Sequence, residues 1–411
     1  MALTRREALA AGAAATLAAP AIARSAGASP DVVVIGAGVF GAWTARRLQA
    51  AGQRVTLLDA WGPAHARASS GGESRMTRGA YGADEVYTRM AHDSLPDWQA
   101  LSQRSGLPVF HKTGVLFFSA TFDDYFRQTI ETHRRLGLPT QALDNKALRR
   151  RFPQIDFEGI EIGVWEPQFG ALMARRAVQT LAAEFVAAGG TYVQAAVRPP
   201  VSTGERLSEV RTADGGRFQA GRFVFACGPW LPKLFPDLLG RRIFPTRQEI
   251  FFFAPQAGDA RFLPGRFPGW ADFNGGDIYY GFPDLENRGF KIANDKHGPP
   301  MDPDKGDRIP LPAALADVRA YIARRFPALA KAPLSEARVC QYENSANGDF
   351  LIDFHPQLKN VLLIGGGSGH GFKHGPAVGR YAAALLSQPS APVEPRFSLA
   401  SKGEVQARAV H

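Results

Sequence analysis

A glycine-rich turn close to the N-terminus carries the residue types that hold a dinucleotide. Residues 31–59 read DVVVIGAGVFGAWTARRLQAAGQRVTLLD. Gly36 permits a tight turn, Gly38 lets backbone N–H groups approach a pyrophosphate, and Gly41 lets a helix pack closely on a strand. Asp59 follows at strand length, where its carboxylate can accept hydrogen bonds from ribose hydroxyls, which fits FAD or NAD and disfavours NADP. The predicted contacts of this unit are Gly36, Gly38, Val39, Phe40, Gly41 and Asp59.

A second glycine-rich turn lies near the C-terminus. The apolar run 361–364 leads into GGGSGHGFK at 365–373, and a helix-like pattern follows. Backbone N–H donors at a helix N-terminus suit an anion, and a reduced flavin carries its negative charge at N1 and O2. We interpret this turn as the isoalloxazine end of the cofactor site, with a simple glycine-rich connection as the alternative. Its predicted contacts are Gly367, Ser368, Gly369, His370, Gly371 and Lys373.

Two arginines stand three residues apart in the polar stretch after Asp59. Arg75 and Arg78 can point the same way from a helical turn, which would let them act together on an anion. The alternative is a solvated surface turn. This stretch is too polar and too rich in Gly and Ser to continue a parallel sheet.

The order of apolar runs and turns around these residues predicts an α/β fold that is α+β overall. The run 31–59 is a complete βαβ unit, 174–188 reads as a helix, and 191–197 as a strand. The run 222–231, RFVFACGPWL, reads as a buried strand that returns to the nucleotide-binding sheet. Alternating apolar residues in 245–293 predict an antiparallel sheet above the flavin.

The predicted organisation is a Rossmann-type FAD-binding domain and an antiparallel-sheet substrate domain within residues 31–390. Both are discontinuous in the sequence. The FAD-binding parts are about 31–85, 170–235 and 335–390, and the substrate parts are about 86–169 and 236–334.

The first residues predict an export signal. Thr4, Arg5 and Arg6 precede an Ala-rich apolar run that ends in the triplet 21–23, Ala-Ile-Ala. This order is typical of a twin-arginine signal peptide, here 1–23, although an Ala-rich helix of the mature protein has the same composition. Twin-arginine export carries folded proteins, which suits an enzyme that takes up a flavin first. We therefore expect a periplasmic or extracellular protein.

Composition narrows the partners. The formal net charge is +10, but the Lys and Arg residues are scattered and no nucleic-acid motif accompanies them, so an anionic substrate or a dinucleotide is the simpler explanation. Cys227 and Cys340 lack metal-ligand spacing, and one disulfide between them stays open at this point. No stretch beyond the signal approaches a membrane span. We expect no metal, no nucleic acid and a monomer.

Five motifs together carry a resemblance to a known family. They are ESRMTRGAYG at 73–82, GFK at 289–291, VCQY at 339–342, DFHP at 353–356 and GSGHGFK at 367–373. The chain resembles the monomeric sarcosine oxidase and N-methyl amino acid oxidase group of the D-amino acid oxidase superfamily over nearly all of 31–390.

The resemblance implies residue roles. Cys340 takes the place of the cysteine that binds the flavin 8α-carbon through sulfur, and Arg75 lies near the flavin ring. Arg78 and Lys373 would clamp the substrate carboxylate. Lys291 matches the lysine that activates O2, where a fixed cation stabilises the superoxide formed by the first electron. The remaining implied positions are Tyr280 and Tyr342 in the substrate pocket and Val197 beside the adenine.

Two departures concern the pocket. The family has a histidine pair where this chain has Ser70 and Gly71. Counted without gaps from Lys291, the pocket histidine becomes Asp295, and His297 fills the role if the loop shifts. A carboxylate there would favour a substrate with an additional cation.

The sequence therefore predicts an exported FAD-dependent oxidase of small secondary amino acids or amines, which forms an imine and hydrogen peroxide. The resemblance implies FAD held covalently through Cys340 and O2 as acceptor. The alternative is an exported dehydrogenase that passes electrons to a quinone or cytochrome. A non-catalytic flavoprotein that keeps only the fold is a third reading, which the set Arg78, Lys291, Cys340 and Lys373 disfavours.

Overall fold

One sheet is built from strands at both ends of the described chain. The computed structural model describes residues 29–273 and 278–407. Its six-stranded sheet has the order β18-β19-β12-β1-β2-β9, and every neighbouring pair is parallel except β18 and β19. Apolar runs form these strands because both faces of the sheet are covered. The bounds are β1 Val32–Ile35, β2 Val55–Asp59, β9 Thr191–Gln194, β12 Arg222–Phe225, β18 Leu351–Phe354 and β19 Val361–Gly365.

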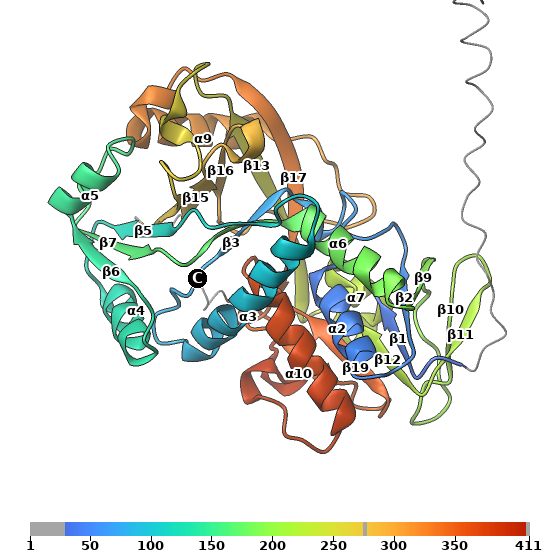
Figure 1. The fold of residues 1–411 in the computed structure, drawn as a ribbon. Coiled ribbons are helices and arrows are strands. Elements are labelled where there is room, and N and C mark those ends of the chain that lie inside the picture. Colours follow the sequence, from blue (N-terminus) through green and yellow to red (C-terminus); the bar gives the residue numbers. More distant parts are fainter. Residues whose placement is uncertain (1–28, 274–277, 408–411) are drawn as a thin grey trace, which may run out of the picture.

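Helices cover one face of this sheet, and they lie in front of it in Figure 1. They are α2 Val39–Ala50, α3 Glu85–Arg104, α6 Ala174–Ala187 and α10 Gly375–Ser387. Close packing of α10 on α2 depends on Gly379, where an added Cβ would lie 2.8 Å from the backbone of Trp43. The opposite face packs on α7 Leu231–Leu234, α8 Pro236–Leu239 and the hairpin of β10 Glu209–Arg211 and β11 Arg217–Gln219.

A second sheet of eight strands has the order β17-β13-β16-β15-β14-β5-β7-β6. Neighbours are antiparallel except β14 and β5. Helix α9, Pro312–Arg325, packs on an aromatic core that includes Trp270 and Phe290. The bounds are β5 Val115–Ser119, β6 Gln141–Asp144, β7 Ile162–Glu166, β13 Ile243–Phe253, β14 Gly269–Asp272, β15 Tyr279–Phe282, β16 Phe290–Asn294 and β17 Leu334–Ser345. The predicted α/β class with an antiparallel second sheet is confirmed, and β5, β6, β7 and β17 extend that sheet beyond the predicted 245–293.

A third sheet has three strands in the order β3-β8-β4. Its strands are β3 Ser74–Thr77, β4 Phe110–His111 and β8 Gly170–Met173, and two further helices are α4 Asp124–Arg135 and α5 Asn145–Arg151. The helical turn predicted for Arg75 and Arg78 is wrong. Arg75 is paired with Leu172 across the β3–β8 ladder, because a partner strand supplies hydrogen bonds that the local sequence does not reveal.

Two predicted strands end earlier than expected. The strand that begins at Thr191 ends at Gln194, and β12 ends at Phe225. After β12 the chain turns at Gly228, which has φ +53° and begins a short 3-10 helix, η2 Gly228–Trp230. Pro229 could not continue the strand, because it lacks the N–H that a ladder hydrogen bond needs.

The predicted signal segment 1–23 lies outside the described residues, and the division into two discontinuous domains stays a prediction. Among the residues described, no helix combines the length and the apolar character that crossing a membrane requires.

Candidate active site

The first glycine turn contains two glycines that the fold needs and one that it does not. Gly36 has φ +104°, and a Cβ there would lie 2.3 Å from Ala226 O. A Cβ on Gly41 would lie 1.8 Å from Gly36 O, so the helix could not approach the strand. At Gly38 the nearest atom to an added Cβ is Ser70 Oγ at 3.5 Å, an ordinary contact. Gly38 faces a cavity, and its missing side chain leaves space for a ligand rather than for the fold.

That cavity has a volume of about 390 Å³ and joins the two glycine turns. This size lies within the usual range of ligand and cofactor sites, which is roughly 300–1,000 Å³. The predicted cofactor residues that line it are Gly36, Gly38, Val39, Phe40, Asp59, Arg75, Val197, Gly367, Gly369 and Gly371. Residues distant in the sequence therefore meet in one site.

Asp59 organises the loops on both sides of the cavity. Its Oδ2 accepts a hydrogen bond from Ala37 N at 2.7 Å, and its Oδ1 accepts from Trp61 N and Gly62 N, both at 2.9 Å. The carboxylate at the end of β2 thus fixes the first glycine turn and the following loop, besides facing the predicted ribose position.

Ser70 has a role that the sequence did not reveal. Its Oγ accepts a hydrogen bond from Val39 N at 3.0 Å, at the N-terminus of α2. Gly71, in the same 3-10 helix η1 Ser69–Gly71, has no space for a side chain, since a Cβ would lie 2.0 Å from His65 O. Ser70 and Gly71 are therefore both built into the packing around the cavity.

Arg75 connects the cavity to Cys340. Its guanidinium donates to Ser74 O at 2.8 Å, to Ser69 O at 2.6 Å and to Cys340 Sγ at 3.3 Å. Cys340 is buried in the middle of β17. The sulfur of Cys340 is therefore in direct contact with a guanidinium group.

Lys291 lies on β16 and is only 1% exposed, so the alternative of a surface charge is wrong. Its Nζ donates to Ser74 O at 2.8 Å and to Ser74 Oγ at 3.0 Å, and it stands 5.0 Å from the Phe282 ring. Burial, and then the nearby Arg75, lower the pKa of Lys291 well below its ordinary value. The structure therefore keeps an amine in a site where its charge is costly unless an anion forms beside it.

Arg78 and Lys373 form a second buried cationic group, and Lys373 is 4% exposed. Arg78 Cζ lies 3.9 Å from the centre of the Tyr81 ring, and Lys373 Nζ lies 5.0 Å from the same centre. Lys373 Nζ also donates to His370 O at 2.7 Å. Burial and then Arg78 lower the pKa of Lys373 well below its ordinary value, while Glu166 acts in the opposite direction. A carboxylate between the two cations would remove this repulsion.

Two tyrosines, Tyr280 and Tyr342, lie together with the carboxylate of Asp295. Tyr342 Oη donates to Asp295 Oδ1 at 2.6 Å, and the Tyr280 and Tyr342 oxygens are 3.4 Å apart. Burial and then Asp295 raise the pKa of Tyr280 to about 12. Of the two candidate residues for the histidine position, Asp295 contacts Tyr342 and His297 contacts Gln406.

Glu343 is a cavity residue that the sequence analysis missed. It lines the cavity, is 6% exposed, and burial raises its pKa to about 8, although the N–H groups of Gly366 and Gly367 act in the opposite direction. Its Oε1 has no hydrogen-bond partner within the described parts of the chain. The sequence did offer a signal, because Glu343 is an acidic residue within the segment VCQYENS, which forms the buried end of a strand.

The loop 367–373 places its other predicted residues behind the cavity wall. Ser368 Oγ accepts from Ser345 N at 3.1 Å and donates to Gly366 O at 2.9 Å. His370 Nε2 lies 3.0 Å from Gly348 O. These contacts hold the loop so that Gly367, Gly369 and Gly371 face the cavity.

Neither cysteine is in a disulfide, and residues 29–273 and 278–407 contain no group of His, Cys, Asp and Glu that could hold a metal ion. The donors present instead suit FAD. The open Gly38 and the α2 N-terminus can receive the diphosphate, Asp59 can receive the ribose, and the 367–371 turn can receive the electron-rich edge of the flavin.

Comparison with known proteins gives the same result. Residues 31–385 match the DAO family, described as FAD dependent oxidoreductase. The monomeric sarcosine oxidase of Bacillus sp. (strain B-0618) is 30% identical over 364 residues, which cover 87% of this chain and 91% of that protein. The N-methyl-L-tryptophan oxidase of Salmonella arizonae is 31% identical over 381 residues, which cover 90% of this chain and 99% of that protein.

Among solved structures, the L-proline dehydrogenase from P. horikoshii superposes with a TM-score of 0.78 at 21% identity. The match covers 90% of this chain and 97% of that one. At this identity the likeness is one of fold.

Proposed function

Since the chain belongs to the DAO family of FAD-dependent oxidoreductases, we propose that it oxidises small secondary amino acids or amines and passes the electrons to O2. The products are an imine, which water hydrolyses, and hydrogen peroxide. The names of its relatives support this substrate class, because sarcosine and N-methyl-L-tryptophan are both N-methyl amino acids.

The observation that carries the proposal is the presence of two buried cationic groups, one formed by Arg78 and Lys373 and the other by Lys291 beside Ser74. Arg78 and Lys373 suit a substrate carboxylate, since a planar guanidinium and an ammonium can bind its two oxygens together. Lys291 is the separate cation that stabilises the negative charge that develops on O2. A surface-charge reading does not explain two lysines that are almost fully buried.

When bound, FAD supplies the acceptor for the two electrons that leave the carbon next to the amine nitrogen. The chain holds the uncharged amine in place through its carboxylate at Arg78 and Lys373, so that the reacting C–H bond has a fixed orientation. Tyr342 and Asp295 face the amine part and select its substituent. Lys291 is held in place by Ser74. Its ammonium group would stabilise the negative charge that forms on O2.

We also propose that Cys340 attaches the flavin covalently. A bond from Sγ to a flavin methyl carbon would replace one methyl hydrogen and the thiol hydrogen, and this two-electron oxidation would need O2 as acceptor and would release hydrogen peroxide. The contact between Arg75 and Cys340 Sγ supports the proposal, because it places the sulfur beside a residue that lines the cofactor cavity. After acid denaturation the wild-type protein should stay yellow, and its mass should exceed that of the polypeptide by one FAD. The Cys340→Ser variant should release its flavin under the same conditions.

The proposal includes export before function. The Thr4-Arg5-Arg6 pattern supports twin-arginine transport of a folded, flavin-loaded monomer to the periplasm or beyond. Cell fractionation of the wild-type chain and of a variant with Arg5→Lys and Arg6→Lys checks it. Retention of only the variant in the cytoplasm supports export, and equal distribution refutes it.

The first experiment is an anaerobic flavin spectrum against sarcosine, other N-methyl amino acids, cyclic, cationic and primary amino acids. Bleaching that air reverses, with formation of hydrogen peroxide, supports the oxidase. Bleaching that persists in air and is reversed by a quinone indicates the dehydrogenase alternative. Absence of bleaching with every amine refutes the substrate class while leaving the family assignment intact.

A further inference from the structure

Tyr81 touches both cations of the proposed carboxylate clamp and both histidines of the second glycine loop. Its ring centre lies 3.9 Å from Arg78 Cζ and 5.0 Å from Lys373 Nζ. Its hydroxyl lies 3.1 Å from His370 Nδ1 and 2.8 Å from His374 Nε2. Tyr81 is itself buried. One side chain thus joins residues 78, 370, 373 and 374, which come from opposite ends of the chain.

The two cations need such a partner. Both are buried, and the charge of Arg78 opposes protonation of Lys373. Glu166 and Asp295 favour the charged lysine. The face of an aromatic ring carries a negative quadrupole and attracts a cation within about 6 Å of its centre. The Tyr81 ring is therefore suited to hold the two cations close together before a carboxylate arrives.

The hydroxyl group fixes the orientation of the ring, and the hydrogen-bond pattern assigns both imidazole tautomers. His370 Nε2 faces the carbonyl of Gly348 at 3.0 Å, so Nε2 carries the proton. His370 Nδ1 then accepts from the Tyr81 hydroxyl, whose oxygen accepts from His374 Nε2–H. This leaves His374 Nδ1 as a bare acceptor, and that atom indeed has no hydrogen-bond partner in the described chain.

His374 is neutral in this arrangement. Burial, followed by Lys373, His370 and Arg78, lowers the pKa of His374 well below its ordinary value. A protonated His374 would need a second acceptor, and it would add a third positive charge beside Lys373. The Tyr81 hydroxyl thus bridges the two imidazole rings.

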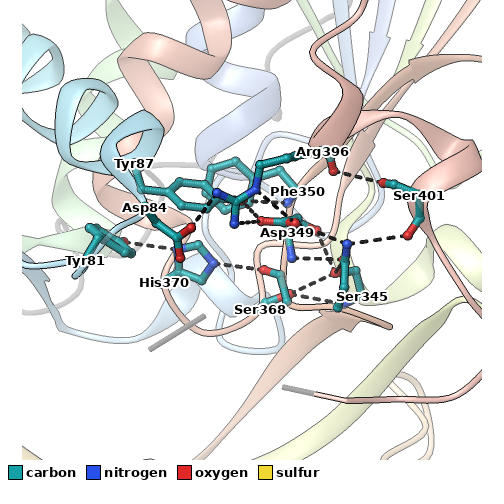
Figure 2. Close-up of polar contacts among 12 residues, drawn as sticks. Tyr81, Asp84, Tyr87, Ser345, Asp349, Phe350, Ser368, His370, Arg396 and Ser401 are labelled. Carbon is teal, nitrogen blue, oxygen red and sulfur yellow. Dashed lines mark hydrogen bonds and ion pairs between the residues drawn. The ribbon is translucent and has the colours of Figure 1, made fainter. Parts of the chain in front are cut away.

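The surrounding cluster holds His370 from the other side. Its ring stacks on Phe350 with centroids 4.9 Å apart, and it meets the Tyr87 ring edge-on at 4.9 Å. Figure 2 shows Arg396, from the C-terminal segment, between Asp84 and Asp349, with Tyr87 beside them. The same view shows the contact of Tyr81 with His370. This packing, together with the contacts of the Tyr81 ring with the Tyr87 and His370 rings, determines the position of Tyr81.

From this geometry we propose that Tyr81 is the positioning residue of the carboxylate clamp, with its ring holding Arg78 and Lys373 together. Its hydroxyl, which bridges His370 and His374, contributes to the stability of the fold. This inference rests on the proposed function of the two cations as the carboxylate site. It adds a residue that contacts neither the carboxylate nor the flavin and acts through the cations.

The test measures the Kd of propanoate from the change it causes in the flavin absorption spectrum. Propanoate carries the carboxylate and has no amine, so no turnover is required. Tyr81→Met fills similar volume without a π face, and we expect its Kd to be about tenfold higher than that of the wild type. Tyr81→Phe keeps the ring, and its Kd should stay within about twofold of the wild-type value.

Tyr87→Phe is the matched control. It also removes one buried hydroxyl with two hydrogen bonds, to Asp349 Oδ1 at 2.8 Å and from Phe350 N at 3.3 Å, and its ring also packs on His370. Tyr81→Phe and Tyr87→Phe should lower the melting temperature by similar amounts and leave the propanoate Kd unchanged. A merely structural role predicts that Kd follows stability in all three variants.

If Tyr81→Met does not retain flavin, 4-cyanophenylalanine at position 81 keeps the ring shape and weakens its negative face. A raised propanoate Kd in that protein supports the inference. An unchanged Kd in Tyr81→Met or in the cyano variant overturns it, as does a wild type that binds no propanoate. Failure of the proposed function is a separate result. In that case the flavin-loaded protein binds propanoate normally, but no amine bleaches its flavin.

Discussion

Glu343 makes the stability of the apoprotein depend on pH in a direction that can be worked out from the structure. Burial in the wall of the cofactor cavity raises its pKa from an ordinary 4.5 to about 8. Between these two values the folded apoprotein binds more protons than the unfolded chain, so its free energy of unfolding falls as the pH rises. The contribution of this group changes by about 3.5 kcal/mol between pH 5 and pH 8.

The Glu343→Gln variant removes this titration and keeps the shape of the side chain. Its amide oxygen can still face the N–H groups of Gly366 and Gly367. We expect the flavin-free variant to be similar to the wild type in stability near pH 5 and more stable near pH 8. Exposed Glu131 provides a control, because Glu131→Gln makes the same change of charge at the surface.

The assay is urea unfolding of the three apoproteins, followed by far-UV circular dichroism at pH 5, 6, 7 and 8. The difference in free energy between Glu343→Gln and the wild type should widen with pH by up to about 1.4 kcal/mol for each unit. The difference for Glu131→Gln should stay constant. A constant difference for Glu343→Gln as well would refute the buried, protonated carboxyl group.

Three further predictions concern the cofactor and the substrate. Lys291→Met should leave anaerobic flavin reduction intact and slow reoxidation by O2 about 100-fold, measured by stopped flow, because the fixed cation is gone; unchanged reoxidation would show that Lys291 has another role. Gly38→Val should weaken FAD binding in a fluorescence titration while changing the apoprotein melting temperature little, and Gly41→Ala should prevent folding, since the two glycines serve the ligand and the fold respectively. Asp295→Asn should lower kcat/KM about tenfold for cationic N-methyl amino acids relative to sarcosine, as expected for loss of one ion pair in a partly buried site; an equal fall for both would refute a charge-selective role.

The sequence by itself determined the cofactor end of the molecule. The strand, glycine turn, helix and acidic residue of 31–59 are contiguous, so local sterics and hydrogen bonding specify them, and the structure forms β1, α2 and β2 there. The glycine turn that follows β19 was equally readable, because a buried apolar strand and a helix flank it. The same local pattern gave the α/β class.

The candidate site was predictable only as a set of residue types. The motifs singled out Arg75, Arg78, Lys291 and Lys373, but neither their burial nor their grouping follows from spacing. The helical turn assigned to Arg75 was wrong because the β3–β8 ladder pairs residues about a hundred positions apart. The contact of Asp295 likewise depends on the position of Tyr342 on a different strand.

Tyr81, Glu343 and Ser70 acquired their roles only in the folded chain. Tyr81 lies 289 and 293 positions from the two histidines that its hydroxyl joins, and Ser70 receives a hydrogen bond from a helix 31 positions away. Local propensity acts over a few residues, whereas the environment of a buried polar group is made by whichever distant segments pack around it. The sequence therefore specified the elements and the chemical types of their residues, whereas the packing of distant segments set which charges, rings and carboxyl groups face one another.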